Sequence, residues 1–254
     1  MGADDGRLFL QCQPILDLKP NEIWGFEALA RLNSDKLGIV QPSEFIPIAE
    51  KTKFIVPIGR RVLFEAFRFL NKLKELGHDR ICVSINVSII QLLRHDFCRE
   101  LLETINEMGV SPANVGIEIT ESAFAWDFEA LNRILAELRD AGLQVAIDDF
   151  GTGYSSLARE RELSVNCLKL DKYFVDKLMY LDPEEAITRD VALMAHRLGH
   201  CVVAEGVEHE RQKQCLLDYG CDKIQGYLVS GPLSEDEALE LLKRQREDRQ
   251  SPAV

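Results

Sequence analysis

Short apolar runs alternate along the chain with longer amphipathic stretches, and most of these runs end in a polar or charged residue. Each run is rich in β-branched residues, which is typical of a strand buried on both faces of a parallel sheet. The residues at the run ends are Glu27, Asn86, Glu118, Asp148, Asp149, Lys169, Glu205 and Gln225. Because parallel strands end at one common edge, we expect these side chains to face a shared pocket.

The first two runs, at 8–18 and 22–32, are joined by only three residues, which is too short for a parallel crossover. We therefore expect these two strands to pair antiparallel. Helices are expected at 43–50, 57–76, 91–108, 128–141 and 208–218, from 234 onward, and in a region ending at 198 that is interrupted near Asp182 and Pro183. The resulting order predicts an α/β fold, a TIM-type (β/α)8 barrel with the first strand antiparallel.

Length and charge narrow the class of protein. The 254 residues suit a single barrel domain, which we place at 1–246, and the charged segment 247–254 is expected to be a disordered tail. A net charge of −12 disfavours a nucleic acid polymer as partner, because such binding needs a basic surface. The sequence has no apolar run of membrane-spanning length and no signal-peptide pattern at its start, so we expect a cytoplasmic protein without a membrane partner.

The cysteines and histidines do not form a recognisable metal motif. Seven cysteines without a CxxC pair fit a reducing compartment, and we expect Cys82, Cys167 and Cys201, which lie inside strand-like runs, to be buried free thiols. The histidines share no zinc-site spacing, so we expect them at the surface or at helix ends. They are His78, His95, His196, His200 and His209.

The polar run ends have the chemistry of a site for a hard divalent cation. Glu27, Asn86, Glu118 and Asp148 offer the oxygen ligands that Mg²⁺ and Mn²⁺ prefer. Asp149 allows a second ion about 4 Å away, the spacing that serves phosphoryl displacement. A single acidic residue is more often a solvated loop charge or a helix cap, but a cluster of carboxylates would repel itself without cations. We therefore expect metal ions, with Lys169 supplying part of the positive charge.

The motifs around these residues resemble those of one known family. They are QPI at 13–15, EALAR at 27–31, INVS at 85–88, EITES at 118–122, DDFGTGYSS at 148–156, LKLD at 168–171, AEGVE at 204–208 and QGY at 225–227. In this order and over nearly the whole chain, they resemble the EAL-domain cyclic di-GMP phosphodiesterases. The resemblance implies hydrolysis of cyclic di-GMP to linear pGpG with two Mg²⁺ or Mn²⁺ ions.

The resemblance also implies a role for each matched residue. The first metal would be held by Glu27, Asn86, Glu118 and Asp148, the second by Asp148 and Asp149, and Glu205 would contact metal or metal-bound water. Lys169 would orient the attacking water, and Gln225 would hold the hydrogen-bond geometry. Gln13, Leu29 and Arg31 would contact the substrate, for which the planar guanidinium of Arg31 suits a phosphate.

Regulation is the part of the resemblance that this sequence fits least well. Glu121 matches a residue that anchors the loop after Asp149, which is implied to couple the metals to a homodimer interface. Beyond that loop the usual residues are replaced by Arg159, Glu160, Ser164 and Asn166, so the dimer geometry stays open. Gly151 and Gly153 could give this loop mobility or simply form a tight turn. We interpret the chain as a module that works with upstream sensor domains outside it.

Two other functions are compatible with a barrel of this kind. A receptor could bind cyclic di-GMP without cleaving it, although such a receptor would be free to lose Glu27, Asp148 or Lys169, and all three are present. A metal-dependent barrel enzyme could also act on another small phosphate or an enolate, but Gln13, Arg31 and Gln225 would then coincide by chance. The phosphodiesterase is therefore the leading hypothesis.

Overall fold

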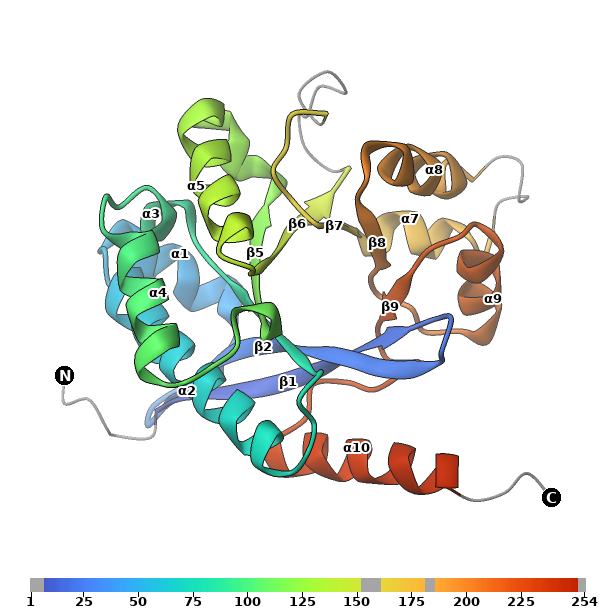
Figure 1. Ribbon diagram of the computed structural model, residues 1–254, viewed down its shortest axis with the longest axis horizontal. Coiled ribbons are helices and arrows are strands. Elements are labelled where there is room, and N and C mark those ends of the chain that lie inside the picture. The colour runs from blue at the N-terminus through green and yellow to red at the C-terminus, as the bar shows by residue number, and fades with distance from the viewer. Residues whose placement is uncertain (1–6, 152–160, 181–185, 251–254) are drawn as a thin grey trace.

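The computed structural model describes residues 7–151, 161–180 and 186–250. Strands form the centre of the molecule and helices surround them (Figure 1). The strands are β1 (Leu8–Asp17), β2 (Glu22–Ser34), β3 (Gly38–Val40), β4 (Cys82–Asn86), β5 (Val115–Thr120), β6 (Gln144–Phe150), β7 (Cys167–Leu170), β8 (Cys201–Ala204) and β9 (Lys223–Gln225).

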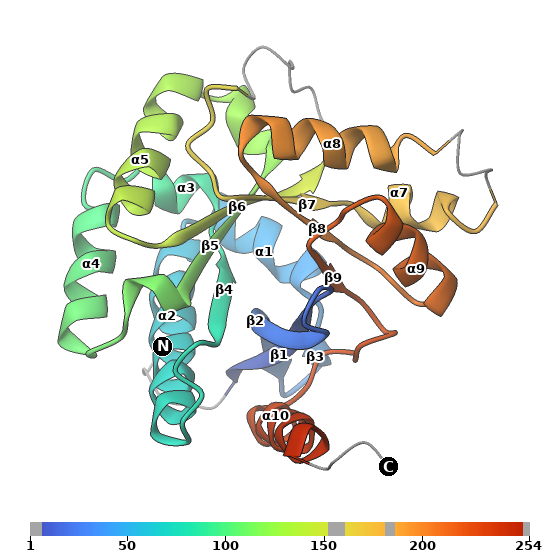
Figure 2. The same cartoon turned by 45° about the vertical axis from the view of Figure 1, so that its right-hand side comes forward.

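The sheet closes into a barrel because β1 pairs with both of its ends. This strand is antiparallel to β2 along its whole length and antiparallel to β9 near Asp17. The other neighbours, in the order β2, β4, β5, β6, β7, β8 and β9, are all parallel (Figure 2). The predicted TIM-type barrel with an antiparallel first strand is therefore confirmed. Within the described ranges β3 pairs only with β2, and this short edge strand had no counterpart in the prediction.

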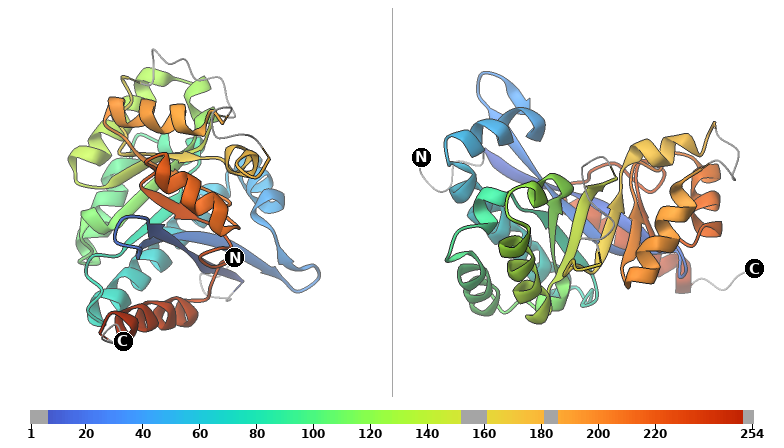
Figure 3. Two further views of the ribbon diagram at one scale, coloured as in Figure 1. Left: turned by 90° about the vertical axis from the view of Figure 1, so that its right-hand side faces the viewer. Right: turned by 90° about the horizontal axis from the view of Figure 1, so that it is seen from above.

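Helices cover the outside of the barrel, as the view from above shows (Figure 3). They are α1 (Pro42–Lys51), α2 (Ile55–Glu75), α3 (Ile89–Leu92), α4 (Phe97–Glu107), α5 (Phe128–Asp140), α7 (Lys172–Lys177), α8 (Thr188–Leu198), α9 (Glu210–Asp218) and α10 (Glu235–Gln250), with 3₁₀ turns η1 (Pro112–Asn114) and η2 (Glu121–Ala125). None of the helices in the described ranges combines the length and the apolar character needed to cross a bilayer.

Two helical segments differ from their predicted extent. The single helix expected at 91–108 is divided into α3 and α4, and between them Arg94 forms an ion pair of 2.7 Å with Asp96, the residue that precedes α4. At the other end of the chain α10 continues to Gln250, through charged residues that we expected to be frayed. Glu240 and Arg244, one turn apart, pair at 3.3 Å and support this helix. Residues 251–254 lie outside the described ranges, and the domain boundary at 246 stays a prediction.

The strands separate two layers because successive side chains point to opposite faces. On β5, Val115, Ile117 and Ile119 belong to the large apolar core that includes the buried face of α2, with Phe67 fully enclosed. Glu118, between two of them, faces the barrel interior. A smaller apolar cluster lies inside the barrel and includes Ile15, Cys167 and Val203. The polar run ends are therefore forced inward by the apolar residues that must face the helices.

The cysteines inside the barrel correct one expectation. Cys167 and Cys201 are register partners on the parallel strands β7 and β8, and they form a disulfide with Cα atoms 4.4 Å apart. Free thiols were expected because the spacing of cysteines along the sequence does not reveal which strands become neighbours. Cys82 is a buried free cysteine as expected.

We expect this disulfide to make a large contribution to the stability of the oxidised protein. It joins residues 34 apart in the sequence, and restricting an unfolded loop of that length contributes roughly 3–4 kcal/mol. Urea unfolding monitored by circular dichroism should show this loss of unfolding free energy when a reductant is added. Thermal unfolding should show a fall in Tm of roughly 10 °C under the same conditions. The Cys167→Ala variant should not respond to the reductant. An equal response in wild type and variant would contradict the assignment.

Candidate metal centre at the barrel mouth

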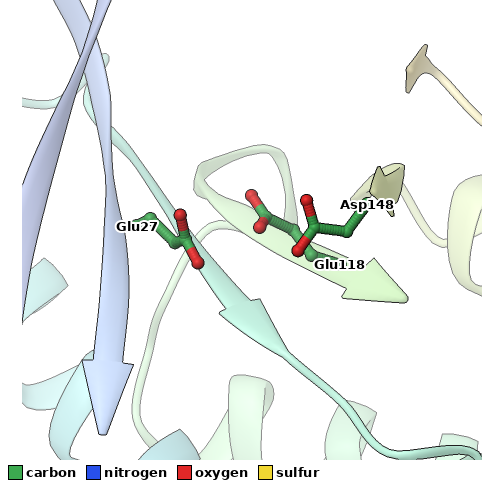
Figure 4. A group of neighbouring side chains, drawn as sticks. All are labelled: Glu27, Glu118 and Asp148. Carbon is green, nitrogen blue, oxygen red and sulfur yellow. The ribbon is translucent and has the colours of Figure 1, made fainter. Parts of the chain in front are cut away.

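Three carboxylates from three strands converge at the carboxyl end of the barrel. Glu27 on β2, Glu118 on β5 and Asp148 on β6 offer oxygen atoms that all lie within 4.8 Å of one another (Figure 4). Asn86 on β4 is the register partner of Glu118, and its Nδ2 donates a 2.6 Å hydrogen bond to Glu27 Oε1. The structure therefore brings together all four residues expected around the first metal.

A break in the register lets two consecutive aspartates face the mouth. Neighbouring residues of a regular strand point to opposite faces, so Asp148 and Asp149 could not both do so from an unbroken β6. The pairing of β6 with β7 is irregular between Ile147 and Phe150, and Asp149 has a φ of 55°, in the left-handed region. Asp148, Asp149 and Glu205 then form a second group with oxygens within 4.8 Å of one another.

Lys169 stands at the centre of both groups. Its ammonium Nζ lies 2.7 Å from Glu205 Oε1 and 2.5 Å from Glu118 Oε2. The same nitrogen lies 3.2 Å from Glu27 Oε2 and 3.3 Å from Asp148 Oδ1. The side chain is 1% exposed, so these carboxylates replace the water that would otherwise solvate it. One buried cation is thus shared among four anionic groups.

This shortage of positive charge shifts the pKa values of the carboxyl groups. Burial raises the pKa of Glu118 well above its usual range, and burial raises that of Glu205 to about 8, in both cases against the attraction of Lys169. Burial and the neighbouring Asp148 also raise the pKa of Asp149. Burial would lower the pKa of Lys169, but the carboxylates around it raise that pKa, so the amine stays protonated. The site therefore favours additional cations.

Hydrogen bonds fix the orientation of Glu27. Gln225 Nε2 on β9 donates to Glu27 Oε2 at 2.7 Å, on the opposite oxygen from Asn86. Burial raises the pKa of Glu27, but Lys169, Gln225 and Asn86 outweigh it and leave the pKa below its usual value. Glu27 is therefore held as an oriented carboxylate, which is the state a metal ligand needs.

A polar atom without a donor marks the place for a cation. Asp148 Oδ1 is buried and accepts no hydrogen bond from the residues that the structure describes, and its only close cation there is Lys169 Nζ at 3.3 Å. A buried carboxylate oxygen in this state is costly unless a positive ion compensates it. Because hard oxygen ligands surround it, the donor set fits Mg²⁺ or Mn²⁺. Within the described ranges neither carboxylate group includes a histidine, and the buried His200 lies at the end of α8, where its backbone amide donates to Ala195.

The residues expected to contact substrate line the β1–β2 side of the mouth. Gln13 is the register partner of Glu27, and its Oε1 accepts a 3.3 Å hydrogen bond from Gln225. Leu29 on β2 is half-buried, and Arg31 follows two residues later on the same strand. Arg31 Nε donates a 2.7 Å hydrogen bond to Gln11 Oε1. Burial lowers the pKa of Arg31, which nevertheless stays charged at neutral pH.

Sequence reasoning did not single out two residues near this mouth. Tyr227, which follows Gln225 in the QGY motif, is 70% exposed and close enough to Arg31 to influence its charge. Glu50 at the end of α1 accepts a 2.6 Å hydrogen bond from Ser88, which follows Asn86 and caps α3. The QGY motif could have indicated Tyr227, whereas nothing in the sequence places Glu50 beside Ser88.

Glu121 reaches the segment that follows the aspartate pair. Its Oε2 accepts a 2.9 Å hydrogen bond from the backbone amide of Gly151. Gly151 has a φ of 93°, and the ring of Phe174 occupies the place where a Cβ would lie, so this glycine forms a tight turn. Gly153, Arg159 and Glu160 lie outside the described residues.

The other two departures from the family pattern lie just before β7. The backbone amide of Ser164 donates to Asn132 Oδ1 on α5 at 2.7 Å, and Asn166 Oδ1 accepts a 2.8 Å hydrogen bond from the amide of Val145 on β6. These contacts hold the incoming chain against its neighbours, so the segment that leads to Lys169 is well anchored.

Comparison with known proteins identifies the family. The model of the EAL domain matches residues 2–232, which include every strand of the barrel. The chain belongs to the EAL domain family. As an EAL domain, it has the strand-end carboxylates that the sequence predicted, and the structure brings them together at one mouth.

Solved and curated relatives agree with this assignment. A cyclic di-GMP phosphodiesterase of Pseudomonas aeruginosa, NbdA, is 35% identical over 98% of this chain and 32% of its own. The PaMucR phosphodiesterase, solved in complex with c-di-GMP, has a TM-score of 0.86 at 33% identity and covers 91% of this chain and 94% of its own. The EAL enzyme Bd1971, in its cAMP and cyclic-di-GMP bound form, has a TM-score of 0.87 at 32% identity, covering 94% of this chain and 65% of its own. This EAL domain spans about a third of the length of the first curated relatives that it matches.

Binding of Mn²⁺ should release protons at neutral pH. Glu205 has a pKa of about 8 and Glu118 a raised pKa in the metal-free protein, so protons occupy these carboxyls below that range and a cation must displace them. Calorimetric titration in buffers of different ionisation enthalpy should show release on the order of one proton per site at about pH 7, and affinity should rise with pH until about pH 8. Affinity that is independent of pH across this range would contradict the titration assigned to the mouth.

Proposed function

We propose that this domain hydrolyses one phosphodiester of cyclic di-GMP to give linear pGpG, using two Mg²⁺ or Mn²⁺ ions. The observation that carries the proposal is the pair of carboxylate groups that share Asp148 and surround Lys169. One shared carboxylate between two ion positions suits the clamping of an attacking and a leaving oxygen. The phosphodiesterase name of NbdA and the c-di-GMP bound to PaMucR support the choice of substrate.

Each protein group then has a defined part in the displacement. When bound, the two cations supply Lewis acidity to the phosphate and to the attacking water. Glu205 accepts a proton from that water, and Lys169 Nζ at 2.7 Å fixes the carboxylate in place. The water oxygen forms a bond to phosphorus as the bond from phosphorus to the ribose 3′ oxygen breaks. The departing 3′ oxygen takes up a proton to become a hydroxyl.

Residues on one side of the mouth hold the parts of the nucleotide that do not react. Arg31 keeps its guanidinium positioned through Gln11 and provides a planar pair of donors for a phosphate. Gln13 is linked to Ser230 and to Gln225, so a substrate contact at Gln13 would be coupled to the carboxylate cluster. The exposed ring of Tyr227 offers a flat apolar surface for a guanine base.

Assembly and location are further parts of the proposal. We infer a homodimer formed through the loop after Asp149, upstream sensor domains, and action in the cytoplasm. Residues 152–160 of that loop lie outside the described ranges, and the curated relatives are about three times as long as this chain. The dimer and the additional domains rest on the family resemblance.

The direct test is an assay of the purified chain with cyclic di-GMP. With Mg²⁺ or Mn²⁺ the protein should form pGpG, which chromatography detects, and EDTA should abolish this product. Ca²⁺ should support nucleotide binding with little turnover, because its bonds to ligands are longer and its coordination geometry is looser. Glu27→Gln should lower turnover by roughly a thousandfold, and the exposed Glu44→Gln should not. Nucleotide that stays bound and uncleaved with every metal would favour the receptor function instead.

A second prediction separates positioning from metal ligation. Glu121→Ala removes the acceptor of the Gly151 amide and should lower turnover roughly tenfold or more while weakening Mn²⁺ affinity, since supporting residues set the placement of metal ligands. Glu121→Gln keeps an acceptor oxygen and should restore most of both properties.

The control for this change is Glu129→Ala, an exposed acid in the first turn of α5. It should leave Mn²⁺ affinity and turnover unchanged. If Glu121→Ala behaved like Glu129→Ala, the hydrogen bond to Gly151 would have no part in holding Asp148 and Asp149.

A further inference from the structure

A second buried lysine lies inside the barrel, below the metal centre. Lys223 on β9 is 9% exposed, and its Nζ lies 3.6 Å from Cys201 Sγ and 4.6 Å from the centre of the Trp24 ring. Cys201 is one half of the disulfide with Cys167. An ammonium group is costly to bury, and the proposed hydrolysis does not use this one. Its position beside a disulfide sulfur gives it a chemical role of its own.

We propose that Cys167 and Cys201 form a redox-active pair whose state is transmitted to Lys169 and Glu205, and that Lys223 assists its opening. The effect on turnover rests on the proposed hydrolysis, whereas the redox chemistry of the pair and its effect on metal affinity do not.

The disulfide can be reduced by a low-molecular-weight dithiol in two exchange steps. A thiolate of the dithiol attacks Cys167 Sγ, the bond between the two protein sulfurs breaks, and Cys201 leaves as a thiolate beside the ammonium of Lys223. The second thiol of the reductant then displaces Cys167, and the reductant becomes a disulfide. Two electrons and two protons pass to the protein. An oxidised low-molecular-weight disulfide reverses the reaction.

The position of Lys223 favours Cys201 as the leaving group. A neighbouring cation stabilises a thiolate and speeds thiol–disulfide exchange when that thiolate departs. Cys201 is partly exposed, whereas Cys167 is buried beside Ile15 and Val203, so a small reductant reaches the pair from the side of Cys201. The cysteines therefore have both a stabilising group and a route for a small reductant.

The strands connect the pair directly to the metal centre. Cys167 precedes Lys169 by two residues on β7, so both side chains point inward, and β8 runs from Cys201 to Ala204, immediately before Glu205. Inside the barrel, the disulfide thus lies in the layer of inward-facing side chains directly below the one that contains Lys169. Because two unbonded sulfurs need more room than a bonded pair, we expect opening of the bond to shift β7 relative to β8.

Small movements of these strands matter at the mouth. Lys169 Nζ is 2.5 Å from Glu118 and 2.7 Å from Glu205, and functional groups of this kind tolerate displacements of about 0.5 Å. The structure with the disulfide closed has Lys169 in contact with all four carboxylates. We therefore expect the oxidised form to bind metal more tightly and to turn over faster.

Counting thiols tests the pair without reference to hydrolysis. The chain has seven cysteines, of which five are free when the disulfide is closed, so alkylation of the denatured protein and mass measurement should find five modified sites after oxidised glutathione and seven after a dithiol. Lys223→Met should slow the reduction by roughly tenfold at neutral pH. Seven modified sites after both treatments would overturn the proposal.

Mn²⁺ affinity and turnover measured on the same oxidised and reduced samples test the coupling. We expect reduction to weaken affinity and to lower turnover, each by roughly threefold or more. Cys201→Ala should abolish both responses, and Cys215→Ala, which changes a partly exposed free cysteine, should retain them. Equal affinity in the two redox states would overturn the coupling. If neither redox state released pGpG, the proposed hydrolysis would be wrong. The number of alkylated thiols and the Mn²⁺ affinity would still test whether the cysteines form a redox-active pair coupled to the metal centre.

Discussion

The attraction between Lys169 and the carboxylates around it is the interaction on which the rest of the site depends. A lone ammonium at this depth would lose its solvation and give up its proton, and lone carboxylates would do the reverse. Together they stabilise each other, with Nζ distances of 2.5–3.3 Å to four oxygens. The balance is incomplete because one positive charge cannot neutralise four ionised carboxylates, and burial raises the pKa values of Glu118 and Glu205. The cluster therefore keeps a strong electrostatic demand for additional cations.

The antiparallel first strand gives this cluster its asymmetry. Because β1 inserts between β2 and β9, Gln13 lies opposite Glu27 while Ile15 lies opposite Gln225. Two amide side chains, of Gln13 and Gln225, therefore meet on the same flank of Glu27. The mouth consequently has a flank rich in neutral donors and cations, with Arg31 beyond it, and a flank of carboxylates on β5 and β6. In the proposed hydrolysis a phosphate ester would approach from the first flank, and the cations would be held by the carboxylates.

The strand-end residues were predictable because each follows a physical pattern that is local in sequence. An apolar run that must face helices forces its alternate and terminal residues inward, and this places Glu118 and Lys169 without any knowledge of their neighbours. What could not be predicted depends on contacts between distant segments. The bond between Cys167 and Cys201 requires knowledge that β7 and β8 are adjacent and in register. The hydrogen bond from Ser88 to Glu50 similarly depends on how α1 packs.

Predicted and observed helices differ for a related reason. Amphipathic periodicity indicated one helix at 91–108, but it does not reveal the break between α3 and α4, where Arg94 pairs with Asp96. Charge alone indicated a disordered tail from residue 247, although residues with good helix propensity extend α10 to Gln250 once Leu242 is buried. In both cases the pattern indicated the presence of a helix correctly, and short-range polar contacts or a single anchoring residue determined where it ended.

The two buried lysines show how one barrel interior produces opposite electrostatic outcomes. Burial disfavours the charged form of both, yet the pKa of Lys169 is raised because four carboxylates contact it, whereas burial lowers the pKa of Lys223, which lies beside an indole ring and a sulfur. Asp17 and Asp222 only partly offset that burial. Lys169 is therefore a fixed cation that organises anions. Lys223 is a less stable cation, and formation of a thiolate at Cys201 would supply the counter-charge that it lacks.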